Sequence, residues 1–340
     1  MTVSFDGSDS IVRLLATRLL PSATVAGRTC DEKVRTRAWA PSTLSRMKNL
    51  RRLRFALTLA WLALVPSRAA AAEEPFFFIQ LSDPQLGMFT ENKDFAQDTA
   101  NFEFAVAAVN RLRPAFVIVT GDLVNKPGDA AQIAEYRRIV GKIDSSIPVY
   151  NIAGNHDVQN EPTPESLAAY SKIFGPDRYT FRHQGLAGIV LNSSVIHSPG
   201  KTPVQLAEQE RWLRAELTKA KAEGARHIVV FQHHPWFIKS PAEADQYFNI
   251  PMVRRVAYMA LFREFGVRYL FCGHYHRNAE ARDGTLENIT SGPVGKPLGG
   301  AKSGIRVAIV RDDQIEHRYY ELGELPVKVE LNPAPMPAKK

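Results

Sequence analysis

Residues 149–157 read Val-Tyr-Asn-Ile-Ala-Gly-Asn-His-Asp. The first five predict a buried strand, because a short, mostly apolar run closed by turn residues is typical of a strand inside a sheet. The next four bend the chain and carry oxygen and nitrogen ligands. Glycine lets the backbone turn sharply, so that the following side chains reach a shared point. This stretch therefore predicts a strand whose carboxyl end supplies part of a polar site.

The same arrangement occurs twice upstream, in alternation with helices. Residues 76–81 and 116–120 are apolar runs that end near an acidic residue, and each predicts a buried strand. Residues 94–113 carry apolar side chains at helical spacing, and residues 130–143 are also predicted to be helical. Such a β-α-β-α-β order predicts an α/β fold with parallel strands inside a sheet that is covered on both faces.

The second half of the chain continues the pattern. Further strands are expected at residues 188–192, 227–231, 268–271, 286–290, 305–310 and 315–320, and helices at 204–223 and 252–265. No internal repeat and no Gly/Ser-rich linker interrupts them. We therefore expect one domain over residues 75–325, followed by a loose proline-rich tail at 326–340.

Polar residues collect at the ends of five predicted strands. These clusters are Asp83-Pro84-Gln85, Gly121-Asp122, Gly154-Asn155-His156-Asp157, Gln232-His233-His234-Pro235 and Gly273-His274-Tyr275-His276. A single cluster of this kind is normally only a turn. Five successive clusters indicate a shared site, because α/β sheets form their sites at the carboxyl ends of the strands. Carboxylate, amide and imidazole ligands suit divalent cations, and their number favours two bridged ions that act on a phosphoryl group.

The order of these motifs resembles the calcineurin-like metallophosphoesterase family, whose pattern is D-x-H, G-D, G-N-H-D/E, a histidine and G-H-x-H. The resemblance covers about residues 76–320 and implies a four-layer αββα sandwich, with two mixed β-sheets flanked by helices. It implies a metal-dependent phosphatase that acts on phosphorylated proteins or small molecules. A branch of the family regarded as serine/threonine phosphatases is the most similar, on stretches that include residues 247–249 and 317–320.

The resemblance also implies residue roles. The implied metal ligands are Asp83, Gln85, Asp122, Asn155, His233, His274 and His276, with Asp122 shared by both ions. His156 is expected near the phosphoryl oxygen or the leaving group, and Asp157 is expected to orient its other ring nitrogen. A metal-bridging hydroxide is expected to attack phosphorus in line.

One position departs from the family pattern. Gln85 stands where most members have histidine, and its carbonyl oxygen favours Mn²⁺ or Mg²⁺ over iron or zinc. Because some members with glutamine there cleave diesters or nucleotide pyrophosphates, that activity is the first alternative to a phosphomonoesterase. An inactive binding module of the same fold is the second.

Four further residues have two interpretations each. Arg277 is either a bidentate phosphate ligand or a solvated arginine, and Asn192 either lines the pocket or is a plain loop residue. Trp236 and Phe237 either form a wall of the cleft or pack beneath the loop.

The charge is uneven along the chain. The formal net charge is +8, yet residues 1–72 hold twelve of the 43 Lys and Arg and four of the 35 Asp and Glu, which leaves 31 of each beyond them. The body therefore has no overall electrostatic bias toward nucleic acid, and no nucleic-acid partner is expected. Two cysteines cannot form a disulfide framework.

The basic leader resembles a targeting segment. Residues 47–72 contain a basic stretch, an apolar run of eleven residues and four closing alanines, which predicts a secretory signal peptide. Eleven residues reach about 16 Å as a helix, short of a bilayer core of about 30 Å. We expect translation to start at Met47, so that residues 1–46 are a non-native extension. We also expect the protein to be exported to the periplasm or the extracellular space and to have no membrane attachment after the signal peptide is cleaved. The alternatives to a cleaved signal peptide that starts at Met47 are a core helix, an uncleaved anchor and an unusually long leader. The sequence indicates no oligomeric state.

Overall fold

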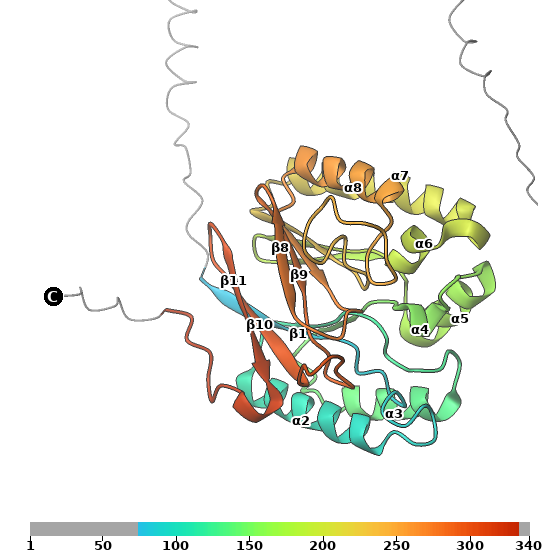
Figure 1. Ribbon diagram of the computed structural model, residues 1–340. Helices are drawn as coiled ribbons and strands as arrows, with labels where there is room; N and C mark the ends of the chain where they lie inside the picture. The colour runs from blue at the N-terminus through green and yellow to red at the C-terminus, as the bar shows by residue number, and fades with distance from the viewer. Residues whose placement is uncertain (1–73, 333–340) are drawn as a thin grey trace, which may run out of the picture. The chain divides into compact units, whose positions relative to one another are not determined.

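The computed structural model describes residues 74–332, which form two β-sheets between two layers of helices (Figure 1). The predicted extension at 1–46 and the signal peptide at 47–72 lie outside the described residues, so both stay predictions. Figure 1 shows helices α2 and α3 below the first sheet and α7 and α8 above the second.

The first sheet contains the β-α-β-α-β unit. Its order is β11-β10-β1-β2-β3, with β11 (Ile315–Glu321), β10 (Gly304–Val310), β1 (Phe76–Leu81), β2 (Val117–Val119) and β3 (Val149–Asn151). Helices α2 (Ala96–Leu112) and α3 (Ala130–Val140) connect β1, β2 and β3, which are parallel as predicted. Because β1 and β2 are in parallel register, both strands end at the same edge, where the Gln85 N–H donates to the Asp122 carbonyl at 2.8 Å.

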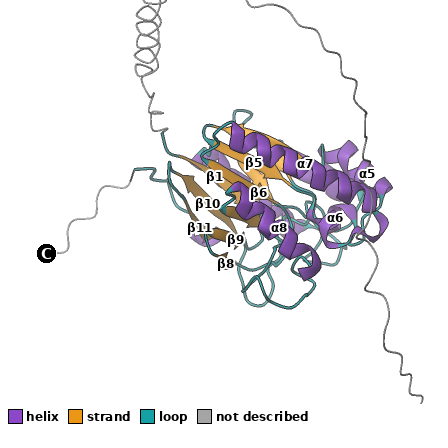
Figure 2. Cartoon of the chain, turned by 90° about the horizontal axis from the view of Figure 1, so that it is seen from above, coloured by secondary structure: helices purple, strands orange, loops and turns teal. Residues whose placement is uncertain are grey.

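The second sheet is also mixed. Its order is β4-β5-β6-β7-β9-β8, with β4 (Tyr179–His183), β5 (Leu186–Val190), β6 (His227–Phe231), β7 (Tyr269–Cys272), β9 (Leu286–Thr290) and β8 (Ala279–Asp283). The four inner strands are parallel, and the two edge strands are antiparallel to their neighbours. Helices α7 (Pro203–Ala222) and α8 (Met252–Phe265) cover its outer face (Figure 2). The predicted four-layer αββα architecture is therefore confirmed.

Strand β1 shows why this fold needs long apolar runs. Successive side chains of a strand point to opposite faces. Phe78 contacts the second sheet, with ring centroids 5.7 Å from Phe231 and 5.2 Å from Phe271. Its neighbour Phe77 packs in the cluster that includes Phe102 of α2. Since both faces are buried, β1 cannot alternate apolar and polar residues.

The sequence patterns did not indicate several short or peripheral elements. These are strands β4 and β8 and helices α4 (Asn155–Val158), α5 (Pro164–Phe174) and α6 (Ser193–His197), with 3-10 turns at Pro199–Lys201 and Leu322–Glu324. The two edge strands each bury a single side chain, Phe181 and Ala281, so neither contains an apolar run.

The chain after residue 325 differs from the expected loose tail. Val329 and Leu331 pack against the core. Arg311 donates to the Leu331 carbonyl at 2.6 Å, and Arg111 donates to the Pro326 carbonyl at 3.1 Å. Residues 326–332 are therefore attached to the domain, and residues 333–340 lie outside the described part.

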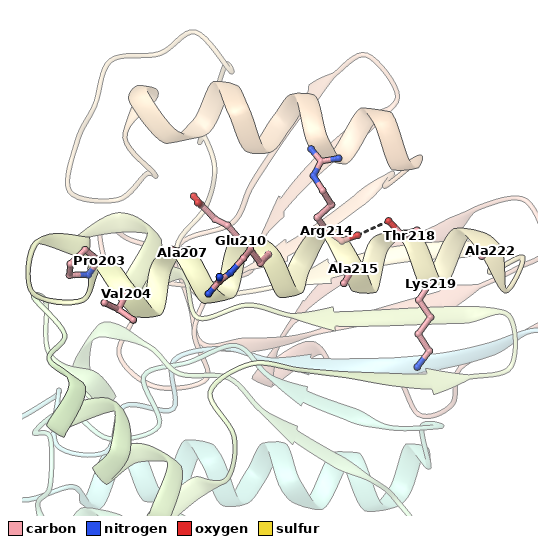
Figure 3. Close-up of a pocket in the computed structure, with 10 residues that line it drawn as sticks. Pro203, Val204, Ala207, Glu210, Arg214, Ala215, Thr218, Lys219 and Ala222 are labelled. Carbon is pink, nitrogen blue, oxygen red and sulfur yellow. Dashed lines mark hydrogen bonds between the residues drawn. The ribbon is translucent and has the colours of Figure 1, made fainter. Parts of the chain in front are cut away.

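Helix α7 carries an open surface groove on its outer side (Figure 3). The lining side chains include Val204, Ala207 and Ala215, with the charged Glu210 and Arg214 between them. No predicted site residue lines this groove. Within residues 74–332, no helix is both long enough and apolar enough to cross a bilayer.

Candidate metal centre

The predicted ligands meet where the carboxyl ends of β1, β2 and β3 face those of β6 and β7. The link between the two sheets is direct, since the backbone N–H of His274 donates to both carboxylate oxygens of Asp83, at 3.2 and 3.1 Å. The Nε2 atom of His276 lies 3.5 Å from Asp83 Oδ1. Residues about 190 positions apart in the sequence thus share one buried site.

One half of the site gathers around His233. Its Nε2 atom lies 3.0 Å from Asn155 Oδ1, 3.1 Å from His274 Nδ1 and 3.3 Å from Asp122 Oδ2. All four side chains are buried. The resemblance assigns the same four residues to the second metal ion.

Each histidine of the centre uses its other ring nitrogen for a backbone carbonyl. The bonds join His233 Nδ1 to Thr120 (2.8 Å), His274 Nε2 to Tyr247 (3.1 Å) and His276 Nδ1 to Lys296 (2.6 Å). A carbonyl oxygen only accepts, so these ring nitrogens carry the hydrogens. The nitrogens that face the centre are then lone pairs in the neutral rings, as metal-binding histidines require. Two lone pairs 3.1 Å apart, with a carboxylate and an amide oxygen beside them, fit a cation.

The other half of the site contains Asp83, Asp122 and His276, whose ligand atoms lie within 4.8 Å of one another. Gln85 extends this group. Its Nε2 donates to Asn125 Oδ1 at 3.1 Å, while its buried Oε1 has no hydrogen-bond donor within residues 74–332. A buried acceptor without a donor costs about 1–3 kcal/mol, and a bound cation would remove that cost. The residues of both halves therefore fit divalent cations.

Electrostatics agrees with this interpretation. Burial alone would raise the pKa of Asp122, but the charges of His233 and His156, together with the hydrogen bond to His233, hold that pKa below its usual range. Burial raises the pKa of Asp83 despite nearby His276 and His233. Burial would lower the pKa of His233, yet Asp122 and Asp83 raise it to about 9. A proton on His233 and a metal cation would therefore compete for the same place beside the two carboxylates.

The backbone is strained at the centre. Five predicted ligands adopt a positive φ that non-glycine residues rarely show, namely Asp83 (46°), Gln85 (37°), Asp122 (51°), His274 (67°) and His276 (55°). Such conformations cost roughly 1–3 kcal/mol each and cluster at functional sites. These turns direct the ligands at the ends of β1, β2 and β7 to one place.

Two motif glycines make room for ligands. A Cβ atom on Gly154 would lie 2.1 Å from Asp122 Oδ1, and one on Gly121 would lie 2.4 Å from His233 Nδ1. No side chain fits at these distances. Close approach therefore requires both glycines, and Gly121 also has a positive φ of 88° that favours glycine.

The structure corrects the role expected for Asp157. The partner of His156 Nδ1 is the Asn125 carbonyl at 2.7 Å. Asp157 instead accepts the backbone N–H groups of Gly154 (2.8 Å), Leu123 (2.9 Å) and Val124 (3.3 Å). Adjacent side chains in a helical turn such as α4 diverge by about 100°, so Asp157 cannot follow the ring of its neighbour. Through these hydrogen bonds, Asp157 links the loop after β2 to the loop after β3.

We therefore expect Asp157→Asn to act on stability. An amide offers one acceptor oxygen, and its NH₂ group would face a backbone donor, so the free energy of unfolding should fall by about 1–3 kcal/mol in urea titration. His156→Ala, at a half-buried position beside it, is the matched comparison and should leave unfolding within about 0.5 kcal/mol. Unchanged stability together with the same loss of turnover as in His156→Ala would restore the orienting role.

The two predicted substrate-binding residues, Asn192 and Arg277, each contact other side chains of the protein. Asn192 caps α6, since its Oδ1 accepts the Ser194 N–H at 3.1 Å and its Nδ2 donates to Asp177 at 2.9 Å. The Arg277 guanidinium lies 4.8 Å from the ring of Tyr275. Substrate contact by Asn192 or Arg277 stays a prediction.

The structure also places residues around the centre whose roles the sequence left open or did not assign. His234 is buried, with its ring 4.3 Å from that of His274 and its Nδ1 2.9 Å from Ser193 Oγ. Trp236 and Phe237 are fully buried in the core, so the packing interpretation holds for both. Tyr247 lies against His274, and only the resemblance of residues 247–249 had drawn attention to it.

Comparison with known proteins identifies the family. The family model described as calcineurin-like phosphoesterase matches residues 78–278. The chain belongs to this family. Relatives named serine/threonine-protein phosphatase CPPED1 are similar over most of their length. The protein of Bos taurus is 37% identical over 269 residues, and that of Homo sapiens is 35% identical over 270 residues; each match covers 75% of this chain and 86% of the relative. The chain is therefore a metal-dependent phosphatase of the calcineurin-like phosphoesterase family, as its motifs predicted.

Solved structures of low identity show the same fold. A dimetal phosphatase from Danio rerio has a TM-score of 0.52 at 16% identity, and the match covers 74% of this chain and 98% of that one. A purple acid phosphatase from yellow lupin has a TM-score of 0.58 at 12% identity, with coverage of 75% and 52%.

Proposed function

We propose that this calcineurin-like phosphoesterase hydrolyses phosphomonoesters, including phosphoserine and phosphothreonine, at two divalent cations. The observation that carries the proposal is the group of buried acceptors around His233, in which two imidazole lone pairs lie 3.1 Å apart beside a carboxylate. The CPPED1 relatives are named serine/threonine-protein phosphatases, which supports this substrate class.

The ligand assignment follows from the two halves of the site. Asp83, Gln85, Asp122 and His276 would hold the first ion, and Asp122, Asn155, His233 and His274 the second. The carbonyl oxygen of Gln85 supports Mn²⁺ or Mg²⁺ at the first position. When bound, two such cations polarise phosphoryl oxygens and lower the pKa of water in the site.

His156 is the proposed proton donor. The Asn125 carbonyl accepts from Nδ1, so a proton that the ring exchanges with substrate is held at Nε2. The backbone N–H of His156 donates to Asp122 Oδ1 at 2.9 Å, which fixes the residue beside the shared ligand. From there Nε2 can protonate the leaving oxygen as its bond to phosphorus breaks.

A substrate panel tests the proposal. Protein loaded with Mn²⁺ would be assayed on phosphoserine and phosphothreonine peptides, nucleotides, p-nitrophenyl phosphate and bis-p-nitrophenyl phosphate. We expect the highest kcat/KM on monoesters. Preference for the diester or for nucleotide pyrophosphates would support the alternative that Gln85 raises. Two bound metals without turnover of any substrate would support an inactive binding module.

We also propose that the protein is exported. Residues 47–72, outside the described part, carry the signal-peptide pattern. On expression in a secreting host from Met47, mass spectrometry of the exported protein should give a chain that begins near Ala72 or Glu73. A mature chain that retains residues 1–46 when the full sequence is expressed would contradict the proposed start and cleavage.

A further inference from the structure

The loop between β6 and α8 holds an exposed phenol against the metal centre. Tyr247 is 52% exposed, although its ring centroid lies 4.9 Å from that of His274. Its hydroxyl oxygen lies 3.3 Å from Asn155 Nδ2. One residue therefore contacts two candidate ligands of the second ion and also reaches solvent.

The loop is held in place by side chains other than Tyr247. Arg255 of α8 is 1% exposed and donates to the carbonyls of Ile250 (3.0 Å), Pro241 (3.1 Å) and Glu243 (2.8 Å). Asn249 donates to Glu243 Oε1 at 2.7 Å, and Glu243 also accepts the backbone N–H of Ile238 at 2.8 Å. The position of Tyr247 is thus fixed by buried polar contacts that do not involve its hydroxyl.

The backbone and the hydroxyl of Tyr247 have separate partners. The backbone carbonyl accepts from His274 Nε2 at 3.1 Å and so determines which nitrogen of that ring faces the centre. The hydroxyl accepts from Asn155 Nδ2 at 3.3 Å, a long and weak contact. Replacing the phenol with a phenyl ring would keep the first contact and remove the second.

The hydrogens around Asn155 leave the phenol proton available. The two hydrogens of Asn155 Nδ2 point to Asn160 Oδ1 (2.8 Å) and to the Tyr247 oxygen (3.3 Å). The phenol is therefore an acceptor toward Asn155 and retains its own hydrogen. The acceptor next to it is Asn160 Oδ1 at 3.5 Å, which is too long for a good O–H···O bond and already bonded to Asn155.

We propose that the Tyr247 hydroxyl donates a hydrogen bond to a phosphoryl oxygen of the substrate, next to Asn155 and His274. Phosphoryl oxygens are acceptors, and a donor that enters no other strong bond is complementary to them. Tyr247 is then a further catalytic residue of the site, with a place in substrate binding distinct from that of His156. This inference rests on the phosphatase activity proposed above.

The test compares two tyrosine variants. Tyr247→Phe removes the proposed donor. Tyr320→Phe removes a phenol of β11, a strand that supplies none of the candidate ligands, and it serves as the control. For wild type and both variants, metal content, affinity for inorganic phosphate by calorimetry on the Mn²⁺-loaded protein, and kcat/KM on a phosphoserine peptide would be measured.

We expect Tyr247→Phe to keep the wild-type metal content and to lose about 10- to 100-fold in phosphate affinity and in kcat/KM, the value of one hydrogen bond to a charged group. Tyr320→Phe should stay within about twofold of wild type in both. Unchanged phosphate affinity in Tyr247→Phe would overturn the inference. Metal loss in Tyr247→Phe would also overturn it, because the hydroxyl would then act through Asn155. Wild-type protein that binds phosphate but turns over no substrate would refute the phosphatase proposal, and the phosphate affinities would still decide the role of Tyr247.

Discussion

Asp122→Asn should remove at least one metal ion per chain and lower turnover by about 10³-fold or more. Asp122 belongs to both candidate metal groups, with Oδ2 3.3 Å from His233 Nε2 and Oδ1 bonded to the backbone N–H of His156. The amide keeps the shape of the side chain but removes the negative charge that two cations would share. Since metal charge stabilises the transition state by several kcal/mol, loss of an ion alone accounts for an effect of this size.

The measurement pairs metal analysis with rates on the same preparation. Asp98→Asn is the control, because Asp98 is also buried but lies outside both metal groups, where it accepts the Gly87 N–H at 3.1 Å. Burial raises the pKa of Asp98 to about 6, whereas nearby histidines hold that of Asp122 low, so the control is a buried carboxyl group without the histidine neighbours of the metal centre. The control should keep both metals. Full metal content with near-normal turnover in Asp122→Asn would reject the assignment of a shared ligand.

His156→Ala should keep both metals and lose roughly 10²–10⁴ in kcat, the usual contribution of a positioned general acid. Its ring makes a hydrogen bond to the Asn125 carbonyl, while the backbone N–H that bonds to Asp122 survives the substitution. His233→Ala is the contrasting variant, because it removes a ligand and should lose the second ion.

The leaving group separates two roles of His156. A p-nitrophenolate needs little protonation, whereas the serine alkoxide needs a proton as it leaves. A general acid therefore predicts a smaller loss in His156→Ala on p-nitrophenyl phosphate than on a phosphoserine peptide. Equal losses on both substrates would leave electrostatic stabilisation of the phosphoryl group as its role. Metal loss in His156→Ala would instead make His156 a ligand.

The inner strands were predictable because each is encoded by its own residues. Residues 76–81 match strand β1 in full, since a strand buried on both faces requires a nearly continuous apolar run. Residues 286–290 also match β9 in full, although this buried strand contains the polar residues Glu287, Asn288 and Thr290. The edge strand β8 contains Glu280, Arg282 and Asp283 and buries only Ala281, so nothing in its sequence separates it from a loop. Its pairing with β9 decides its conformation.

By itself the sequence determined the chemical types of the ligands and their places after the strands, because glycine turns and polar residues at strand ends are local properties of the chain. The tertiary structure alone decided which ligands meet. The ends of β6 and β7 reach Asp83 and Asp122 only because the two sheets pack face to face through Phe78, Phe231 and Phe271. It also decided the hydrogen bonds that orient the site, since the carbonyls of Thr120, Asn125, Tyr247 and Lys296 bind four of its histidines. Every residue has a backbone carbonyl, so no side-chain pattern marks these four, and only the folded chain brings them to the rings.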